Sequence, residues 1–331
     1  MSRTRQHLTP ADLTPLTRAA LGPSRTPVAV TRLRGGTKKG VYRLHLDDGS
    51  TAVAYVWSPD EDYWDAGTPD PRDPFSHGTG LELFTAAHDR LAGAGVRTPR
   101  LLYADATRAL LPADAAVVED VSGGSLEEAL RRDPETAATA LRRLAEALVV
   151  LDARRGPAFG KVALVDNGGT SYGVSCEQRV LDGGLRSVEQ AAVREPRVAA
   201  VRTELADLLR TLAAEVRPRA RHCLVHGELG PDHVLLTPDG HPALIDIEGL
   251  LYFDAEWEHV FLELRFGPHY DVLRTPDLDP DRLRLYRLAM HLGLVSGPLT
   301  LIEGDFPDPE TMRGIAEFNL GRALSLLRTA S

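Results

Sequence analysis

The sequence predicts an α+β protein with two lobes, a small antiparallel sheet on the N-terminal side and a larger, mainly helical part after it. The regular strand patterns lie before about residue 120, and apolar stripes with helical spacing dominate beyond it. The length of 331 residues suits two domains of ordinary size. Hydrophobic residues make up 43% of the chain and charged residues 26%, so a sizeable core is available.

The N-terminal lobe is expected over residues 1–120, in the order strand, glycine-bearing loop, strand, tight turn, strand. Alternating apolar and polar residues at 42–46 have the period of a strand. The turn before the third strand contains Gly49, which tolerates the positive φ of a hairpin turn. The strands of this lobe are expected at residues 28–33, 42–46, 51–57, 101–103 and 115–119.

Residues 58–78 are crowded with Pro, Asp and Gly and show no periodicity. Such long segments are either functional, as lids are, or mobile, and both interpretations stay open. A helix is expected to begin at Thr79, because Thr79 and Glu82 have the spacing of a capping box, and to end at Gly93 and Gly95.

Residues 119–125 are interpreted as a flexible crossing between the lobes, so the C-terminal lobe is expected over residues 121–331. Its first helix should start at a second capping box, formed by Ser125 and Glu128. Apolar stripes and runs predict further helices and two short strands. The helices include residues 141–151, 198–212, 283–294 and 315–327, and the strands lie near residues 234–236 and 243–247.

The net charge of −9 argues against sequence-independent binding to nucleic acid or to an anionic membrane, because both need a basic face. It is compatible with a cationic substrate. Two cysteines cannot build a disulfide framework, which favours a reducing, cytoplasmic location. The N-terminal residues contain no apolar signal segment and no run of eighteen apolar residues occurs, so neither secretion nor membrane insertion is expected. The oligomeric state stays open.

Two carboxylates stand in the positions that phosphoryl transfer requires. Transfer from ATP needs one carboxylate that orients and deprotonates the acceptor hydroxyl, and another that holds magnesium across the phosphates. Glu228 lies in a loop after an apolar strand, and Asp246 lies at the end of the next strand pair. The sequence therefore predicts a catalytic role for Glu228 and a metal-binding role for Asp246. His226, at the end of the apolar strand, is a further candidate of the catalytic loop, for which a structural role is favoured.

This stretch resembles the aminoglycoside phosphotransferase and choline kinase superfamily. The catalytic loop of that family begins His-Gly-Asp, with Asn five residues after the Asp, and its metal motif is an Ile-Asp pair on the following hairpin. Here, His226-Gly227 matches the opening and Ile245-Asp246 matches the metal motif. The segment 254–258 resembles the family's Gly-Asp-Pro-x-x-Asp. The resemblance implies a two-lobed protein-kinase-like fold, the use of ATP and Mg²⁺, and a small-molecule hydroxyl as the acceptor.

Two departures from the family lie in the catalytic loop itself. Glu228 replaces the catalytic Asp, which moves the carboxylate by about 1.5 Å, and a misplacement near 1 Å can cost about a hundredfold in rate. His233 replaces the metal-binding Asn, although magnesium prefers oxygen ligands. The neighbouring Asp232 would supply an oxygen, so Asp232 and His233 remain equal candidates as the second metal ligand.

The third departure concerns the lysine that anchors ATP. The family places it in the third strand, but residues 51–57 contain no lysine, and the chain has only Lys38, Lys39 and Lys161. We expect the missing charge to come from the glycine-loop hairpin, from Lys38, Lys39 or Arg43, with Glu82 as the ion-pair partner. A solvated lysine pair is the alternative.

The remaining candidates surround the nucleotide and the acceptor. Glycines of the loop would clamp the nucleotide, and the backbone of the crossing would meet the adenine. A group of acidic residues would face an amine-bearing substrate, unless these acids only favour a helix start. The loop glycines are Gly35, Gly36 and Gly40, the crossing residues are Glu119 and Val121, and the acidic residues are Asp254, Glu256 and Glu258.

The sequence thus predicts an ATP- and Mg²⁺-dependent O-phosphotransferase that acts on a small amine-bearing molecule, such as an antibiotic or an amino alcohol. The alternative is a pseudokinase-like protein that binds a nucleotide or a small molecule without turnover. A protein kinase is disfavoured because no activation-segment pattern follows Asp246. Neither a Walker A loop nor a His-Glu-x-x-His zinc motif occurs, and the choice between ATP and GTP stays open.

Overall fold

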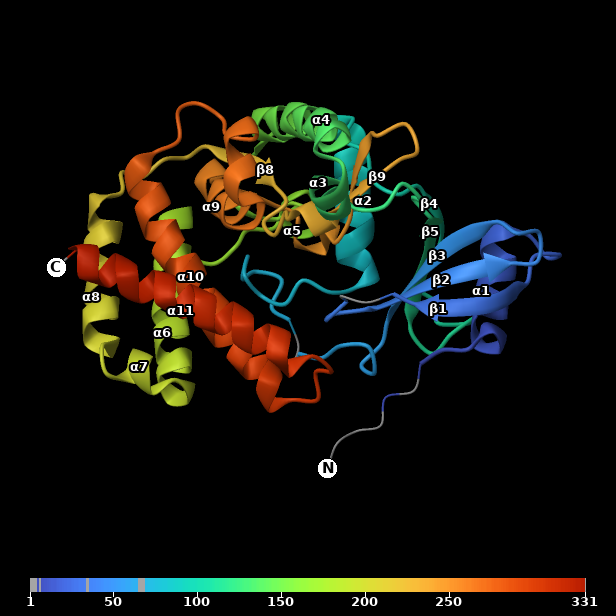
Figure 1. Ribbon diagram of the computed structural model, residues 1–331, viewed down its shortest axis with the longest axis horizontal. Coiled ribbons are helices and arrows are strands. Elements are labelled where there is room, and N and C mark those ends of the chain that lie inside the picture. The colour runs from blue at the N-terminus through green and yellow to red at the C-terminus, as the bar shows by residue number, and fades with distance from the viewer. Residues whose placement is uncertain (1–4, 6, 34–35, 65–68, 331) are drawn as a thin grey trace. The chain divides into compact units, whose positions relative to one another are not determined.

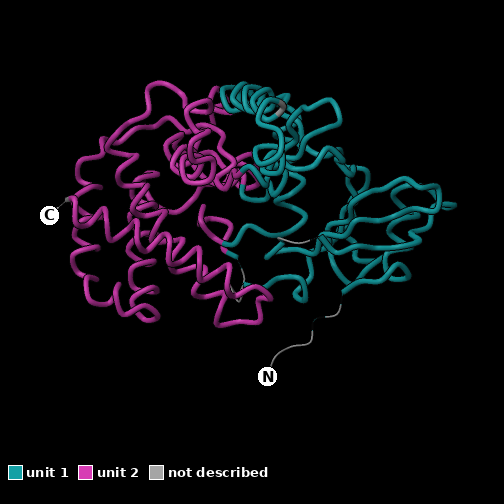
Figure 2. Tube along the Cα trace, in the orientation of Figure 1, with its two compact units in different colours: residues 1–69, 77–150, 231–249 teal, residues 70–76, 151–230, 250–331 magenta. Residues whose placement is uncertain are grey.

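The computed structural model describes residues 5, 7–33, 36–64 and 69–330 and divides into two compact units. Unit 1 comprises residues 1–69, 77–150 and 231–249, and unit 2 comprises residues 70–76, 151–230 and 250–331 (Figure 2). An antiparallel sheet dominates the N-terminal region and helices dominate the C-terminal region, so the predicted α+β class is confirmed.

Unit 1 contains a five-stranded antiparallel sheet in the order β1-β2-β3-β5-β4 (Figure 1). Its strands are β1 (Pro27–Arg32), β2 (Gly40–Leu46), β3 (Thr51–Trp57), β4 (Leu101–Asp105) and β5 (Asp114–Glu119). The helices are α1 (Pro10–Leu21), α2 (Leu81–Ala94), α3 (Leu126–Arg132) and most of α4 (Pro134–Ala153). A hairpin of β9 (Val234–Leu236) and β10 (Pro242–Leu244) lies between the 3-10 turns η1 (Pro231–His233) and η2 (Ile247–Gly249).

Strand β3 is buried on both faces, which explains its continuous apolar run. On one face, Ala54 and Val56 pack with Leu13 and Leu16 of α1, a helix that the sequence analysis did not expect. On the other face, the ring of Tyr55 lies 5.5 Å from that of Phe84 on α2. The Tyr55 ring on this face lies 5.2 Å from the Nζ of Lys39.

Unit 1 extends past the expected boundary at residue 120. Gly123 donates its N–H to the carbonyl of Leu236 at 2.9 Å, and Ser125 forms a β-bridge with Leu235. These bonds join the segment after β5 to the β9–β10 hairpin, so residues 121–150 and 231–249 belong to the same unit as the sheet.

The two predicted capping boxes have different outcomes. Ser125 caps α3, because its hydroxyl accepts the N–H of Glu128 at 3.2 Å. The prediction for α2 is wrong, since the residue before this helix is Gly80, and the hydroxyl of Thr79 donates to the carbonyl of Lys38 at 2.9 Å. Thr79 therefore ties the glycine loop to the start of α2.

The described residues after β3 are tied to the glycine loop. Tyr63 donates its N–H to the carbonyl of Thr37 at 2.9 Å, and the Nε1 of Trp64 donates to the Thr37 hydroxyl at 3.1 Å. Glu61 is buried and accepts hydrogen bonds from Arg32 and from the hydroxyl of Tyr42. Of the predicted segment 58–78, the part at residues 65–68 lies outside the described residues.

Unit 2 is mainly helical and contains a four-stranded sheet in the order β6-β8-β11-β7. Its strands are β6 (Arg155–Gly156), β7 (Gly160–Lys161), β8 (His222–Val225) and β11 (Leu251–Phe253). Its shorter helices are α5 (Val162–Val165), α7 (Pro196–Ala199) and the 3-10 helix η3 (Gly267–Val272). Its longer helices are α6 (Cys176–Arg194), α8 (Arg202–Glu215), α9 (Ala255–Phe266), α10 (Pro280–Glu303) and α11 (Pro309–Ala330).

Helix α10 is the central helix of unit 2. By length and composition alone it is long and apolar enough to cross a membrane. However, 61% of its apolar 18-residue stretch is buried inside the protein. It packs against α6, α8, α9 and α11, and Figure 1 shows α10 and α11 side by side. Its apolarity is therefore that of a core helix.

Candidate active site

The predicted catalytic loop begins where β8 ends. His226 continues the strand and is buried, and Gly227 turns the chain with a φ of 88°, a conformation that favours glycine. Glu228 follows with an exposed side chain. The loop is thus a sharp turn that carries one accessible carboxylate.

Glu258 of α9 holds this turn through a hydrogen bond to its backbone. Its Oε2 accepts the N–H of Gly227 at 2.7 Å, and the side chain is buried. Burial raises the pKa of Glu258 to about 7, although hydrogen bonds from the backbone of Gly227 and His226 lower it. This carboxylate therefore stabilises the loop geometry.

The metal-binding candidates lie together in unit 1. Ile245 donates its N–H to the carbonyl of His233 at 3.0 Å, which brings the next residue, Asp246, beside the imidazole. The Nε2 of His233 lies 3.9 Å from Asp246 Oδ2 and 3.7 Å from Asp232 Oδ2. Both alternatives for the second ligand therefore stay open.

The backbone at Asp246 is unusual. Its φ is 57°, in the left-handed region that residues other than glycine seldom occupy. Such conformations cost free energy and cluster at functional sites, where the surrounding structure maintains them.

Lys39 occupies the interior of this site. Its Nζ lies 2.8 Å from Asp246 Oδ1 and 2.6 Å from Glu248 Oε1, and 5.2 Å from the centre of the Tyr55 ring. Burial alone would lower the pKa of Lys39, but the charges of Asp246 and Glu248 outweigh it and hold this pKa well above its ordinary value. The residue is therefore a buried, permanently charged cation.

The same charges act on the aspartate. Burial alone would raise the pKa of Asp246, but Lys39 above all, and then His233 and Lys38, hold it well below its usual range. The carboxylate is ionised at neutral pH, as a metal ligand must be.

The other two basic candidates have different surroundings. Arg43 pairs with Asp120, with its Nε 2.7 Å from Oδ2. Lys38 has its carbonyl bound by Thr79 and contributes only a smaller part of the charge that acts on Asp246. The predicted partner Glu82 is exposed, and the ion-pair partners of Lys39 are Asp246 and Glu248, so the pairing with Glu82 is wrong.

Two of the loop glycines lie in tight surroundings. A Cβ at Gly36 would come within 2.6 Å of the Lys39 carbonyl oxygen, and one at Gly40 within 2.6 Å of the Glu61 carboxyl carbon. Both glycines thus have a packing role, and Gly35 lies outside the described residues. Their contact with a nucleotide stays a prediction.

The crossing residues lie at the end of β5. The N–H of Glu119 donates to the carbonyl of Arg100 at 2.9 Å, and its side chain pairs with Arg97 at 2.9 Å. Val121 is buried. The predicted contact of this backbone with adenine stays a prediction.

Comparison with protein families identifies the chain. The model of the phosphotransferase enzyme family matches residues 29–262, which include nearly all of the five-stranded sheet, the predicted catalytic loop and the metal-binding candidates. The chain belongs to the phosphotransferase enzyme family. This membership confirms the predicted resemblance and the predicted class of enzyme. A comparison with curated protein sequences found no match.

Solved structures share the fold of this phosphotransferase at low sequence identity. A thermostable mutant of aminoglycoside phosphotransferase APH(4)-Ia has a TM-score of 0.65 and 18% identity, over 92% of this chain and 96% of that one. Choline kinase LicA from Streptococcus pneumoniae has a TM-score of 0.61 and 13% identity, over 96% and 98%. Spectinomycin phosphotransferase APH(9)-Ia has a TM-score of 0.62 and 11% identity, over 94% and 95%.

The acidic group of this phosphotransferase is internal. Asp254, Glu256 and Glu258 are exposed by only 1%, 1% and 4%. Arg282 lies 2.6 Å from Asp254, and Arg219 contacts both Asp254 and Glu256. The prediction that these acids face the substrate is wrong, because the arginines and the Gly227 amide occupy them inside unit 2.

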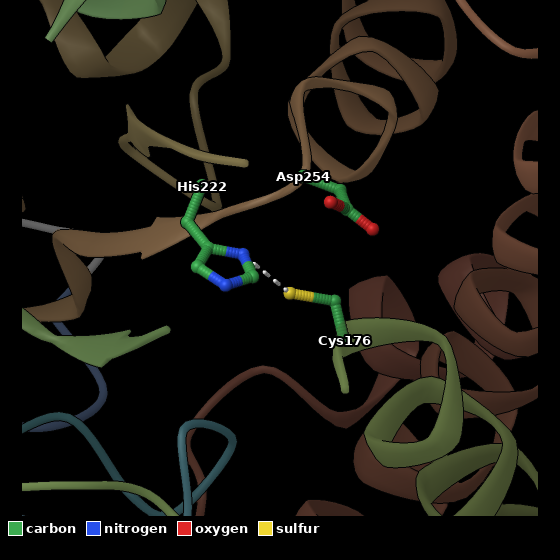
Figure 3. Close-up of side chains that lie close together, drawn as sticks. All are labelled: Cys176, His222 and Asp254. Atoms are coloured by element: carbon green, nitrogen blue, oxygen red, sulfur yellow. Dashed lines mark hydrogen bonds between the residues drawn. The ribbon is translucent and has the colours of Figure 1, made fainter. Parts of the chain in front are cut away.

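One cluster in unit 2 has the composition of a metal site (Figure 3). The ligand atoms of Cys176, His222 and Asp254 lie within 4.8 Å of one another, and the Cys176 sulfur is 3.5 Å from the His222 Nδ1. However, burial raises the pKa of the Cys176 thiol, and Arg282 and Arg219 already neutralise Asp254. A protonated thiol beside an aspartate that is already paired with two arginines does not suit a cation.

The sequence analysis missed two contacts in the candidate site of the phosphotransferase. Glu248 is the buried partner of Lys39, and the Nε1 of Trp57 donates to the same Oε1 at 3.3 Å. The signals were present, since Glu248 follows the metal motif by two residues and Trp57 shares a strand face with Tyr55.

Proposed function

We propose that this phosphotransferase transfers a phosphoryl group from ATP to a hydroxyl group of a small molecule. The observation that carries the proposal is the close grouping of Lys39, Asp246 and Asp232 or His233 within the residues that the family model matches. A buried cation beside ionised carboxylates meets the needs of a site for nucleotide phosphates and a divalent ion. Glu228 would accept the proton of the acceptor hydroxyl.

The side chains fit a magnesium ion. Asp246 and Asp232 would supply the oxygen ligands that magnesium prefers, with His233 as the alternative to Asp232. Lys39 donates to Asp246 Oδ1, whereas Asp246 Oδ2 lies 3.9 Å from the His233 Nε2 and so faces the candidates for the second ligand. Bound magnesium would neutralise charge on the phosphates.

We propose an amine-bearing acceptor such as an antibiotic or an amino alcohol. Solved structures of similar fold contain ADP with hygromycin B and ADP with spectinomycin, and another is a choline kinase. The net charge of −9 is compatible with a cationic acceptor. The buried acids at 254–258 lend no support to this preference. The two free cysteines agree with a cytoplasmic location.

A nucleotide-binding protein without turnover is the second candidate. Glu in place of the catalytic Asp, and His in place of the metal-binding Asn, are the observations that favour it. In that case Lys39 and Asp246 would still bind the nucleotide, whereas Glu228 would have no catalytic effect.

Transfer of label from γ-labelled ATP to a panel of amine-bearing alcohols, with magnesium, separates the two candidates. For the enzyme, Glu228→Gln should reduce transfer by at least about a hundredfold, because the loss of a general base costs 10² to 10⁴ in rate. The variant should still bind Mg-ATP. Glu82→Gln, a change at an exposed glutamate, is the matched control and should leave transfer unchanged. Transfer at the wild-type rate by Glu228→Gln would refute the assignment of the base, and binding without transfer by the wild type would establish the alternative.

A further inference from the structure

We propose that Lys39 replaces the ATP-anchoring lysine that the family places in the third strand. Glu248 forms an ion pair with Lys39 and positions it to bind the nucleotide phosphates. Glu248 is then a positioning residue. The inference rests on the proposed function, because it concerns the same nucleotide site.

The strand register explains how Lys39 reaches the site without a lysine in β3. Val41 pairs with Tyr55 and Gly40 with Val56, so Lys39 precedes β2 at the end of β3 that carries Trp57. The ammonium group lies 5.2 Å from the Tyr55 ring centre, a distance typical of a cation–π contact. Lys39, directly before β2, therefore places its ammonium group beside the face of β3 that carries Tyr55.

Helix α2 cannot supply a buried partner for this lysine. The buried residues of α2 are Leu81, Phe84, Ala87, Leu91 and Ala94, all of them apolar. Phe84 packs on Tyr55 and Trp57, with ring centres 5.5 and 5.6 Å apart. An acid for the ion pair must therefore come from another element, and Glu248 in the turn η2 is that acid.

Glu248 and Asp246 differ in a way that separates their tasks. The side chain of Glu248 is 4% exposed and that of Asp246 is 36% exposed. A buried carboxylate needs a permanent counter-charge, which Lys39 supplies. Asp246 uses Oδ1 for the lysine, and its Oδ2 lies toward His233, where the ion is proposed to bind. Glu248 thus holds the lysine while Asp246 serves the metal.

The geometry leaves one donor for the nucleotide. An ammonium group has three N–H donors, and within the described part of the chain Glu248 and Asp246 accept from Lys39. The remaining donor would bind a phosphate oxygen. Glu248 orients the ammonium group of Lys39 and so sets the direction of its remaining N–H donor. Loss of the Glu248 charge should therefore weaken nucleotide binding by Lys39.

The test is the affinity of the purified full-length protein for Mg-ATP, for ATP without metal and for adenosine. Lys39→Met should weaken Mg-ATP binding by at least about tenfold, the effect of losing a charge-assisted hydrogen bond. Adenosine affinity should not change, because adenosine has no phosphate. The neighbouring Lys38→Met is the matched control and should change Mg-ATP affinity by less than about threefold.

A double-mutant cycle tests the positioning role. Glu248→Gln should weaken Mg-ATP binding in the wild-type background by about tenfold and add less than about twofold in the Lys39→Met background. Glu82→Gln is its control and should have no effect. The double variant removes both buried charges, so it should fold even where Lys39→Met alone is unstable, since that variant leaves Glu248 without its counter-ion.

The outcomes separate this inference from the proposed function. A wild type that binds no Mg-ATP and transfers no phosphate would refute the function itself. A wild type that binds Mg-ATP, together with a Lys39→Met/Glu248→Gln variant of equal affinity, would overturn only the ion pair. Equal losses from Lys38→Met and Lys39→Met, or undiminished loss from Glu248→Gln in the Lys39→Met background, would overturn it as well.

Discussion

Replacing Glu258 by glutamine tests the loop support through the pH dependence of stability. The pKa of this carboxyl rises from 4.5 to about 7 in the folded protein, with burial as the largest cause. Between these values the unfolded chain has lost the proton and the folded chain keeps it, so stability falls as pH rises. Each tenfold change in proton affinity corresponds to about 1.4 kcal/mol, so wild type should lose about 3 kcal/mol of unfolding free energy between pH 4.5 and 7 from this group alone.

Glu258→Gln should abolish that loss. Glutamine keeps an oxygen that can accept the Gly227 N–H but cannot ionise. Urea unfolding of both proteins from pH 4 to 8 would measure the effect, with Glu82→Gln as the control that retains the wild-type pH dependence. The difference between Glu258→Gln and wild type should change by about 3 kcal/mol across this range, in favour of the variant at high pH. Parallel curves for the two proteins would refute the raised pKa.

Three further experiments test the packing within each unit. Arg282→Met should lower the unfolding free energy by about 3–5 kcal/mol in urea titrations, because it leaves Asp254 buried without this counter-ion; a loss below about 1 kcal/mol would contradict the network. Gly40→Ala should cost about 1–3 kcal/mol, since its Cβ would meet Glu61, whereas Gly93→Ala, with open space around its Cβ, should stabilise α2 by up to about 1 kcal/mol. Equal thermal shifts from the two alanines would contradict the close approach. The two buried free cysteines should resist iodoacetamide in the folded protein, and labelling faster than unfolding, detected by mass spectrometry, would contradict their burial.

The sheet could be predicted because its residues obey a local rule. Strand β2 alternates buried and less buried residues with the period of two that its sequence shows. Helix α1 was missed, although Thr9 and Asp12 form a capping box and Pro10 opens the helix. The same signal misled at Thr79, because its hydroxyl has a non-local partner, the carbonyl of Lys38. Spacing along the chain does not show which partner a hydroxyl will choose.

The candidate site divides in the same way. The motif at residues 226–246 could be found from the order of residue types, and the hairpin then brings His233 beside Asp246. The sequence could not show which basic residue enters the site, because Lys38, Lys39 and Arg43 are equivalent candidates until the pairing of β2 with β3 is known. The burial of the acids at 254–258 was equally hidden, since a run of charges does not reveal the buried Arg282 that pairs with Asp254. Local chemistry was visible in the sequence, and long-range pairing was not.

The left-handed backbone at Asp246 has a consequence for mutagenesis. Alanine at this position would remove the carboxylate and also place a Cβ without a compensating polar group in a conformation that costs about 1–2 kcal/mol. Asparagine tolerates that conformation and differs mainly in charge. A loss of stability or nucleotide affinity common to both variants would report the lost charge. Any additional loss in the alanine variant would measure the free energy that the surrounding structure supplies to keep residue 246 in the left-handed conformation.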